Sequence, residues 1–162
     1  TTTKDNFMKK LLAISALSGF SASASAFNEA DAAKLVKAYS NIVACQLEET
    51  KYKAVKVSGD PASTDWGDQY VVYWDGDMGC MGGNGTIVPN FTVVEIHGGN
   101  RPIVLHDYKT PTNELVRATK FSGKDGKVFI EGVSYGPKDQ QHNPTKKVAY
   151  TYKLEADGWV KQ

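Results

Sequence analysis

The sequence has little net charge, few cysteines and no long hydrophobic run. Its 162 residues carry 19 Lys and Arg against 18 Asp and Glu, which gives a formal net charge of +1. Domains that bind nucleic acid are usually clearly basic, so this balance argues against that class. The composition, 41% hydrophobic and 23% charged, is typical of one globular domain and excludes disordered and collagen-like chains.

The apolar segment nearest the start of the chain is short. Met8-Lys9-Lys10 precedes an apolar run over 11–20, and Ala24-Ser25-Ala26 follows it. This order of basic, apolar and small residues is typical of a secretory signal peptide, and the run is too short for a bilayer span of about 20 residues. We therefore predict upstream residues and a signal peptide over 1–26, cleavage after Ala26, and a single exported domain over 27–162. An amphipathic surface helix is the alternative.

Export sets the interpretation of the two cysteines, Cys45 and Cys80. The periplasm and the extracellular space are oxidising, which favours a disulfide between them. On the chain-entropy view, such a cross-link stabilises the fold by about 3–4 kcal/mol. Two unpaired core thiols are the alternative. A catalytic pair is disfavoured because the chain has no Cys-x-x-Cys motif.

The exported part begins with a predicted helix over 28–49. Asn28 is a suitable N-cap, and acids in the first turn interact favourably with the helix dipole. The apolar spacing of three and four residues predicts one buried face, made of Leu35, Tyr39, Ile42, Val43, Gln46 and Leu47. Cys45 then falls in the last turns of this helix.

The chain after Tyr52 has the composition and alternation of strands. Short connections predict antiparallel neighbours, and Pro89 marks an edge position or a bulge. A five-residue hairpin loop is expected over 122–126. The predicted fold is α+β: an N-terminal helix packed on an antiparallel sheet of about six strands, as a meander or half-barrel. The predicted strands are 69–75, 86–97, 102–106, 114–121, 127–135, 146–155 and 159–160.

Charge is unevenly distributed along the chain. No Lys or Arg lies between Lys56 and Arg101, a stretch that holds six acids. The stretch from Arg101 to Gln162 has eleven basic residues against seven acids. An acidic surface of this kind speeds association with a cationic partner, although Asp is also a common residue of solvated turns.

The acidic stretch contains a glycine-rich segment over 74–86 around Cys80. Glycines allow tight turns, and aromatic residues beside a rigid polar loop are good interface anchors. This segment is the predicted recognition loop, with a strand connection pinned by a disulfide as the alternative. The predicted binding residues are Trp66, Asp68, Tyr70, Trp74, Asp75, Asp77 and Asn84.

Catalytic and metal motifs are weak. Residues 132–136 match G-x-S-x-G, but Pro137 follows where a nucleophile elbow needs a helix. Asp75-Gly76-Asp77 resembles the start of a calcium loop without its late Glu. The three histidines are too dispersed for a metal site. We therefore expect no enzyme, cofactor or metal.

The sequence favours an exported binding protein, of the inhibitor or immunity type, for a cationic protein of the cell envelope. We expect no nucleic-acid partner and no membrane insertion after signal cleavage. The alternative is a small-ligand or carbohydrate binder, or a weak hydrolase, with a pocket between helix and sheet lined by Tyr70, Phe129, Tyr150 and Tyr152. An exported structural protein is a third possibility.

Overall fold

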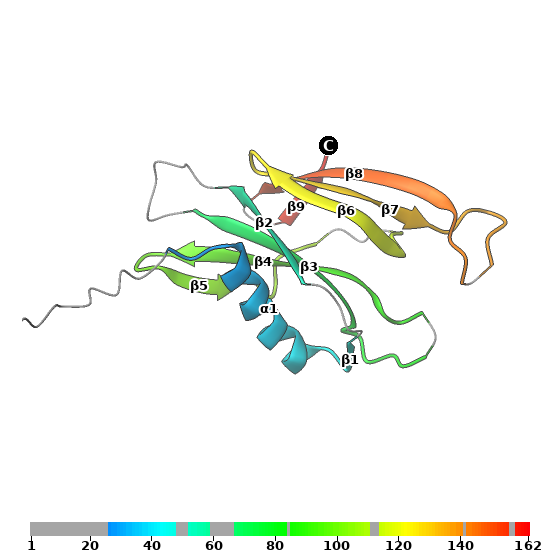
Figure 1. The fold of residues 1–162 in the computed structure, drawn as a ribbon, viewed down its shortest axis with the longest axis horizontal. Coiled ribbons are helices and arrows are strands. Elements are labelled where there is room, and N and C mark those ends of the chain that lie inside the picture. Colours follow the sequence, from blue (N-terminus) through cyan, green and yellow to red (C-terminus); the bar gives the residue numbers. More distant parts are fainter. Residues whose placement is uncertain are drawn as a thin grey trace, which may run out of the picture.

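The protein folds into three layers: one helix, a first β-sheet and a second β-sheet, as Figure 1 shows. The computed structural model describes residues 26–47, 52–58, 67–83, 85–110, 114–140, 142–155 and 158–162. The elements are α1 (Glu29–Val43), β1 (Gln46–Leu47), β2 (Lys53–Ser58), β3 (Gln69–Asp77), β4 (Val88–His97), β5 (Arg101–Val104), β6 (Arg117–Lys124), β7 (Lys127–Ser134), β8 (Lys146–Glu155) and β9 (Gly158–Lys161).

The predicted α+β class with antiparallel strands is confirmed, but the single sheet of about six strands is wrong. Sheet A has five strands, in the order β1-β3-β4-β5 with β2 also paired to β3. Sheet B has four, in the order β6-β7-β8-β9. All of these pairs are antiparallel. The segment after β5 carries the chain from one sheet to the other, where a meander would have continued the same sheet.

The central strands β3 and β4 of sheet A are mostly buried on both faces, which explains the nearly continuous apolar sequence of β3. Val71 and Val93 face sheet B, together with Phe91. On the opposite face, Val72 and Trp74 pack against α1. In β7, by contrast, buried and exposed residues alternate, because only one face of sheet B is covered.

Helix α1 begins as predicted and ends earlier. The Asn28 side chain accepts the N–H groups of Ala30 and Asp31, and Asp31 accepts that of Asn28, which forms a capping box. The predicted end at Glu49 is wrong, since Ala44 is already extended and residues 46–47 form β1. Cys45 therefore lies two residues beyond the helix.

The buried face of α1 is also rotated from the expected one. Its fully buried residues are Ala32, Val36 and Ser40, spaced four apart, while Ile42 is 83% exposed. Two of the three are small, so the helix backbone can lie close to Trp74 and Tyr70 of sheet A. The Ser40 hydroxyl is hydrogen-bonded to that of Tyr52 at 2.6 Å, which satisfies a buried polar group.

The β6–β7 hairpin has a shorter turn than expected. Lys124 and Lys127 are partners, so the connection is the dipeptide Asp125-Gly126 rather than a five-residue loop. Both turn residues have a positive φ, 52° and 70°. An Asp-Gly pair in this conformation is typical of a type I′ turn.

The predicted upstream residues and signal peptide over 1–26 lie outside the described residues, apart from Ala26. The first described residue is Ala26, and Phe27 is already part of the fold. No helix in the described ranges is long and apolar enough to cross a membrane.

Candidate functional site

The segment between β3 and β4, residues 78–87, is the candidate recognition loop. Figure 1 shows it extending past the ends of these strands, near β1. The predicted disulfide is confirmed: Cys45, after α1, is bonded to Cys80 in this loop, with their Cα atoms 5.1 Å apart. The Cys45 N–H also donates to the Asp77 carbonyl at 3.0 Å. The disulfide thus ties the loop to Cys45 after the helix, and the hydrogen bond ties the same residue to the end of β3, just before the loop. A disulfide of this kind fits an extracellular or periplasmic location.

Asp77 organises the loop from inside. Its side chain is only 3% exposed, and the carboxylate accepts the N–H groups of Gly82 at 3.1 Å and Met81 at 3.3 Å. The hydrogen bond from Gly82 is the main cause of a lowered pKa for this carboxyl, so the charged form is favoured. The Asp77 charge therefore serves the loop fold.

The loop backbone needs residues that tolerate a left-handed conformation. Gly82 and Gly83 have φ values of 61° and 125°, and Cys80 itself has 53°. A Cβ would strain the backbone at the two glycines, although it would meet no neighbouring atom there. The glycine-rich composition is thus explained by the turn geometry.

The loop exposes apolar side chains. Met78 is 44% exposed, Met81 79%, and Val88 at the start of β4 42%. Exposed methionines adapt easily to a partner surface because they are flexible and polarisable. Sequence reasoning missed all three. One signal could have revealed them. Apolar residues that lie within or directly after a glycine-rich connection have no regular strand or helix pattern that would bury them.

Two of the predicted aromatic anchors, Trp74 and Tyr70, are not at the surface. Trp74 has no exposed area, and its indole N–H donates to the Thr92 hydroxyl at 2.9 Å. Tyr70 is 2% exposed, and its hydroxyl donates to the Phe27 carbonyl at 3.0 Å. Both belong to the core between α1 and sheet A, so neither can touch a partner in this structure. Trp66 and Asn84 lie outside the described residues.

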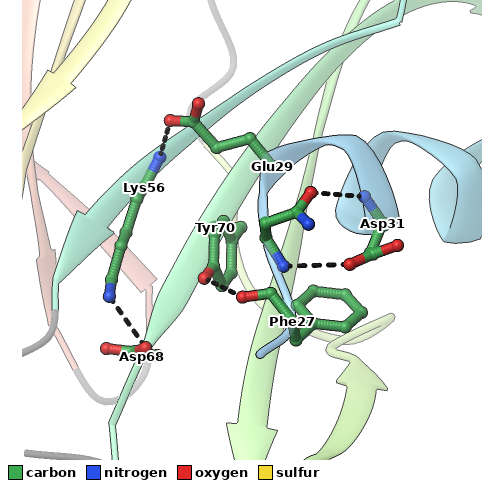
Figure 2. A network of polar contacts seen from close by, with 7 residues as sticks. Phe27, Glu29, Asp31, Lys56, Asp68 and Tyr70 are labelled. Carbon is green, nitrogen blue, oxygen red and sulfur yellow. Dashed lines mark hydrogen bonds and ion pairs between the residues drawn. The ribbon is translucent and has the colours of Figure 1, made fainter. Parts of the chain in front are cut away.

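The acids of the described part of the acidic stretch have internal partners. Figure 2 shows Lys56 between two acids: its ammonium group is 2.8 Å from Asp68, and its backbone N–H donates to Glu29 at 2.9 Å. The hydrogen bond to Asp68 is the main cause of a raised pKa for Lys56. The Tyr73 hydroxyl is 2.7 Å from both oxygens of Asp75. The structure therefore brings Asp75 and Asp77 to the base of the loop but leaves Asp68 at the other end of β3.

A cavity of about 270 Å³ lies beside the loop. Met78 and Val88 line it together with Tyr39 of α1. Residues 88–92 in the first half of β4 line it, and so do Leu105 and His106 of the segment that follows β5. Among the described residues that line it, none is Asp, Glu, Lys or Arg.

The pocket expected between helix and sheet is not formed by the residues named for it. Tyr70 fills the core beneath α1, and Tyr152 fills the core between the two sheets. Phe129 is 39% exposed, and neighbouring residues of β7 show that it lies on the uncovered face of sheet B. These side chains occupy three separate places.

The structure gives no catalytic or metal-binding geometry to the remaining sequence motifs in the described part of the chain. Ser134 of the G-x-S-x-G pattern is a strand residue of β7 and is 2% exposed, without the strand-turn-helix geometry of a nucleophile elbow. In the described part of the chain, no group of three or more His, Cys, Asp or Glu could hold a metal ion. The exposed side chains of the loop, Met78 and Met81, are suited to apolar contacts.

Comparison with known proteins adds no relative: no family model, curated protein or solved structure matches this chain.

Proposed function

We propose that the protein is an exported binding protein whose recognition element is the loop over residues 78–87. The observation that carries the proposal is the exposure of Met78 and Met81 on a loop that is fixed by a disulfide and by Asp77. Ordering a loop before binding reduces the entropy lost on association, so a fixed apolar loop is well suited to recognition. An inhibitor or immunity-type role follows where the partner is an enzyme or a toxin.

The partner we infer is another protein, bound through apolar contacts. The expected cationic partner has less support, because Asp68, Asp75 and Asp77 each have a partner within the fold. The small-ligand alternative also has less support, because the side chains named for its pocket lie apart. Among the described residues, no Asp, Glu, Lys or Arg lines the neighbouring cavity, which supports an uncharged contact.

The test uses a photo-crosslinking amino acid in place of Met81, in the full-length chain expressed in its own cell envelope. The matched control carries the same group in place of Ile103 of β5. The side chain of Ile103 is 42% exposed, a fraction similar to the 44% of Met78. We expect one cross-linked protein from position 81 and none from position 103. Equal cross-linking from both positions would contradict the proposal.

Purified components then test the chemistry of the contact. Replacing both methionines, Met78→Ser with Met81→Ser, should weaken binding of the cross-linked partner by about tenfold or more, with the melting temperature unchanged. An unchanged dissociation constant would overturn the role of the loop. A salt series separates the two partner types, since only a cationic partner requires an association rate that falls steeply with ionic strength.

A further inference from the structure

The outer face of sheet B, which is turned away from sheet A, is rich in bases. Figure 1 shows sheet B as an outer layer, on the other side of sheet A from α1. Residues that alternate with the buried Val128 and Ile130 of β7 point outward, and their cross-strand partners share this face. The bases that the register places on the outer face are Arg117, Lys120, Lys124, Lys127, Lys147 and Lys153.

Three of these lysines form one row across the sheet. Lys127 is the cross-strand partner of Lys124 on one side and of Lys153 on the other. Neighbouring strands are only about 4.8 Å apart, and like charges at directly opposite positions destabilise a sheet. Within the described part of the chain, one lysine of the row forms a salt bridge, Lys153 with Glu155 at 3.1 Å. An anion bound against the row would offset the remaining repulsion.

A second basic group lies at the other end of the face. Arg117 and Lys147 are the cross-strand partners of Val133, on opposite sides of it. Val133 lies six residues after Lys127 in β7, which corresponds to about 20 Å along a strand. Positive charge is therefore spread along the face rather than collected at one point. This spread suits an extended anionic surface better than a single small anion.

Apolar side chains lie among these bases. Phe129, two residues after Lys127 in β7, is 39% exposed, and Val160 of β9, the partner of Lys153, is 44% exposed. An anionic bilayer accommodates both kinds of side chain, because lysines interact with headgroup phosphates and apolar side chains enter the boundary below them. Sheets that bind single-stranded nucleic acid stack bases on several aromatic rings. Phe129 is the only aromatic residue that the described strands β6–β9 place on this face.

We propose that the outer face of sheet B is a second interaction surface, which adsorbs to an anionic lipid bilayer. The acids that strands β6–β9 place on this face, Glu131 and Glu155, each lie beside one of its lysines, Lys120 and Lys153. The other bases have no acidic partner among the described residues, and each base close to an anionic membrane strengthens adsorption. Such adsorption takes place at the bilayer surface and needs no membrane-spanning segment.

This inference goes beyond the proposed function because it does not use the loop over 78–87. That loop is bonded to Cys45, which follows α1 on the far side of sheet A from sheet B. A molecule that adsorbs through sheet B therefore keeps the loop accessible. The bilayer would hold the protein at the membrane while the loop binds its partner.

The probe is a sedimentation assay with vesicles of an equimolar mixture of phosphatidylglycerol and phosphatidylcholine. Vesicles of phosphatidylcholine alone are the control. The protein is purified in its oxidised form from its own cells. We expect adsorption to the anionic vesicles that weakens as salt is added, because salt screens the attraction between exposed charges. Adsorption to neither kind of vesicle, or equal adsorption to both, would overturn the inference.

Paired variants locate the surface. Lys124→Gln with Lys127→Gln should weaken adsorption by about tenfold or more, because both charges lie in the basic row. The control Lys34→Gln with Lys37→Gln removes the same charge from exposed positions of α1 and should change adsorption by less than about twofold. Equal effects of the two double variants would contradict a site on sheet B. Lys124→Arg with Lys127→Arg keeps the charge and should retain adsorption, which separates loss of charge from misfolding.

Two further measurements separate a bilayer from other anions. Phe129→Ala should weaken adsorption by about threefold or more, because the ring no longer enters the bilayer boundary. An unchanged Phe129→Ala variant, or tighter binding of single-stranded DNA or an acidic polysaccharide than of the vesicles, would overturn the lipid assignment. Met78→Ser with Met81→Ser should leave adsorption unchanged. Failure of the loop to bind a partner and failure of sheet B to bind lipid are therefore distinguishable.

Discussion

The hydroxyl of Tyr70 donates a hydrogen bond of 3.0 Å to the carbonyl oxygen of Phe27. The two rings also meet edge to face, with centroids 5.4 Å apart. Phe27 is the residue at which the sequence predicts the exported chain to begin, so these contacts would hold the predicted start of the mature protein against sheet A. The fold therefore uses the residue that signal cleavage would place first.

The first prediction concerns this contact. N-terminal sequencing of the protein recovered after export should give Phe27 as its first residue, and a chain that starts beyond Phe27 would contradict the prediction. Phe27→Ala should lower the free energy of unfolding in urea by about 1–2 kcal/mol, since a half-buried aromatic contact is lost. The control Phe129→Ala, on the uncovered face of sheet B, should change the free energy of unfolding by less than about 0.5 kcal/mol.

The disulfide should make a large contribution to stability. The bond joins residues 35 apart in sequence, for which loop closure predicts about 4 kcal/mol. The double variant Cys45→Ser with Cys80→Ser should lose about this amount in urea unfolding. A reducing agent should have a similar effect on the natural protein and none on the variant. A variant as stable as the oxidised protein would contradict this prediction.

Asp77 should make the protein sensitive to acid. Its folded-state pKa is lowered, chiefly by the N–H of Gly82, so it contributes stability above the unfolded-state pKa of about 3.9. That contribution is lost as the pH falls from about 4 through the depressed folded-state pKa. Asp77→Asn should give a flatter dependence of unfolding free energy on pH in this window.

Gly132 should not tolerate a side chain. A Cβ there would lie 2.2 Å from the Arg117 carbonyl oxygen and 2.4 Å from a methyl group of Leu115, so the backbone of β6 would have to move. Gly132→Ala should therefore cost more than about 2 kcal/mol in urea unfolding. Ala149→Ser, at an exposed position on the neighbouring strand β8, should be close to neutral. A stable Gly132→Ala variant would show that β6 can shift at its bulge.

The strands could be predicted more accurately than their assembly. The alternation around Tyr150 and Tyr152 predicted β8 with the bounds that the structure gives, because one face of this strand is exposed. Local patterns do not reveal which strands share a sheet, since this depends on the path of the segment after β5. They also do not show that α1 covers β3, which is why Tyr70 and Trp74 were expected at the surface.

The helix end shows the same limit. Gln46 and Leu47 continue a helical spacing, but they pair with Asp77 and Gly76 of β3 instead. This pairing with a distant strand ends the helix, and no pattern in the neighbouring sequence indicates it. At the candidate recognition loop, composition correctly indicated a glycine-rich turn that carries one cysteine of the disulfide. It could not indicate that Asp77 would be used internally and that the methionines would face solvent.

The covalent link between the helix end and the loop also affects timing. The cytosol keeps thiols reduced, so in a chain that is exported as we propose, the Cys45–Cys80 bond would close only in the oxidising compartment. Until then the loop around Met81 would lack the cross-link of Cys80 to the segment after the helix. If this loop binds a partner as we propose, newly made chains inside the cell would bind it poorly, and binding would begin only after export.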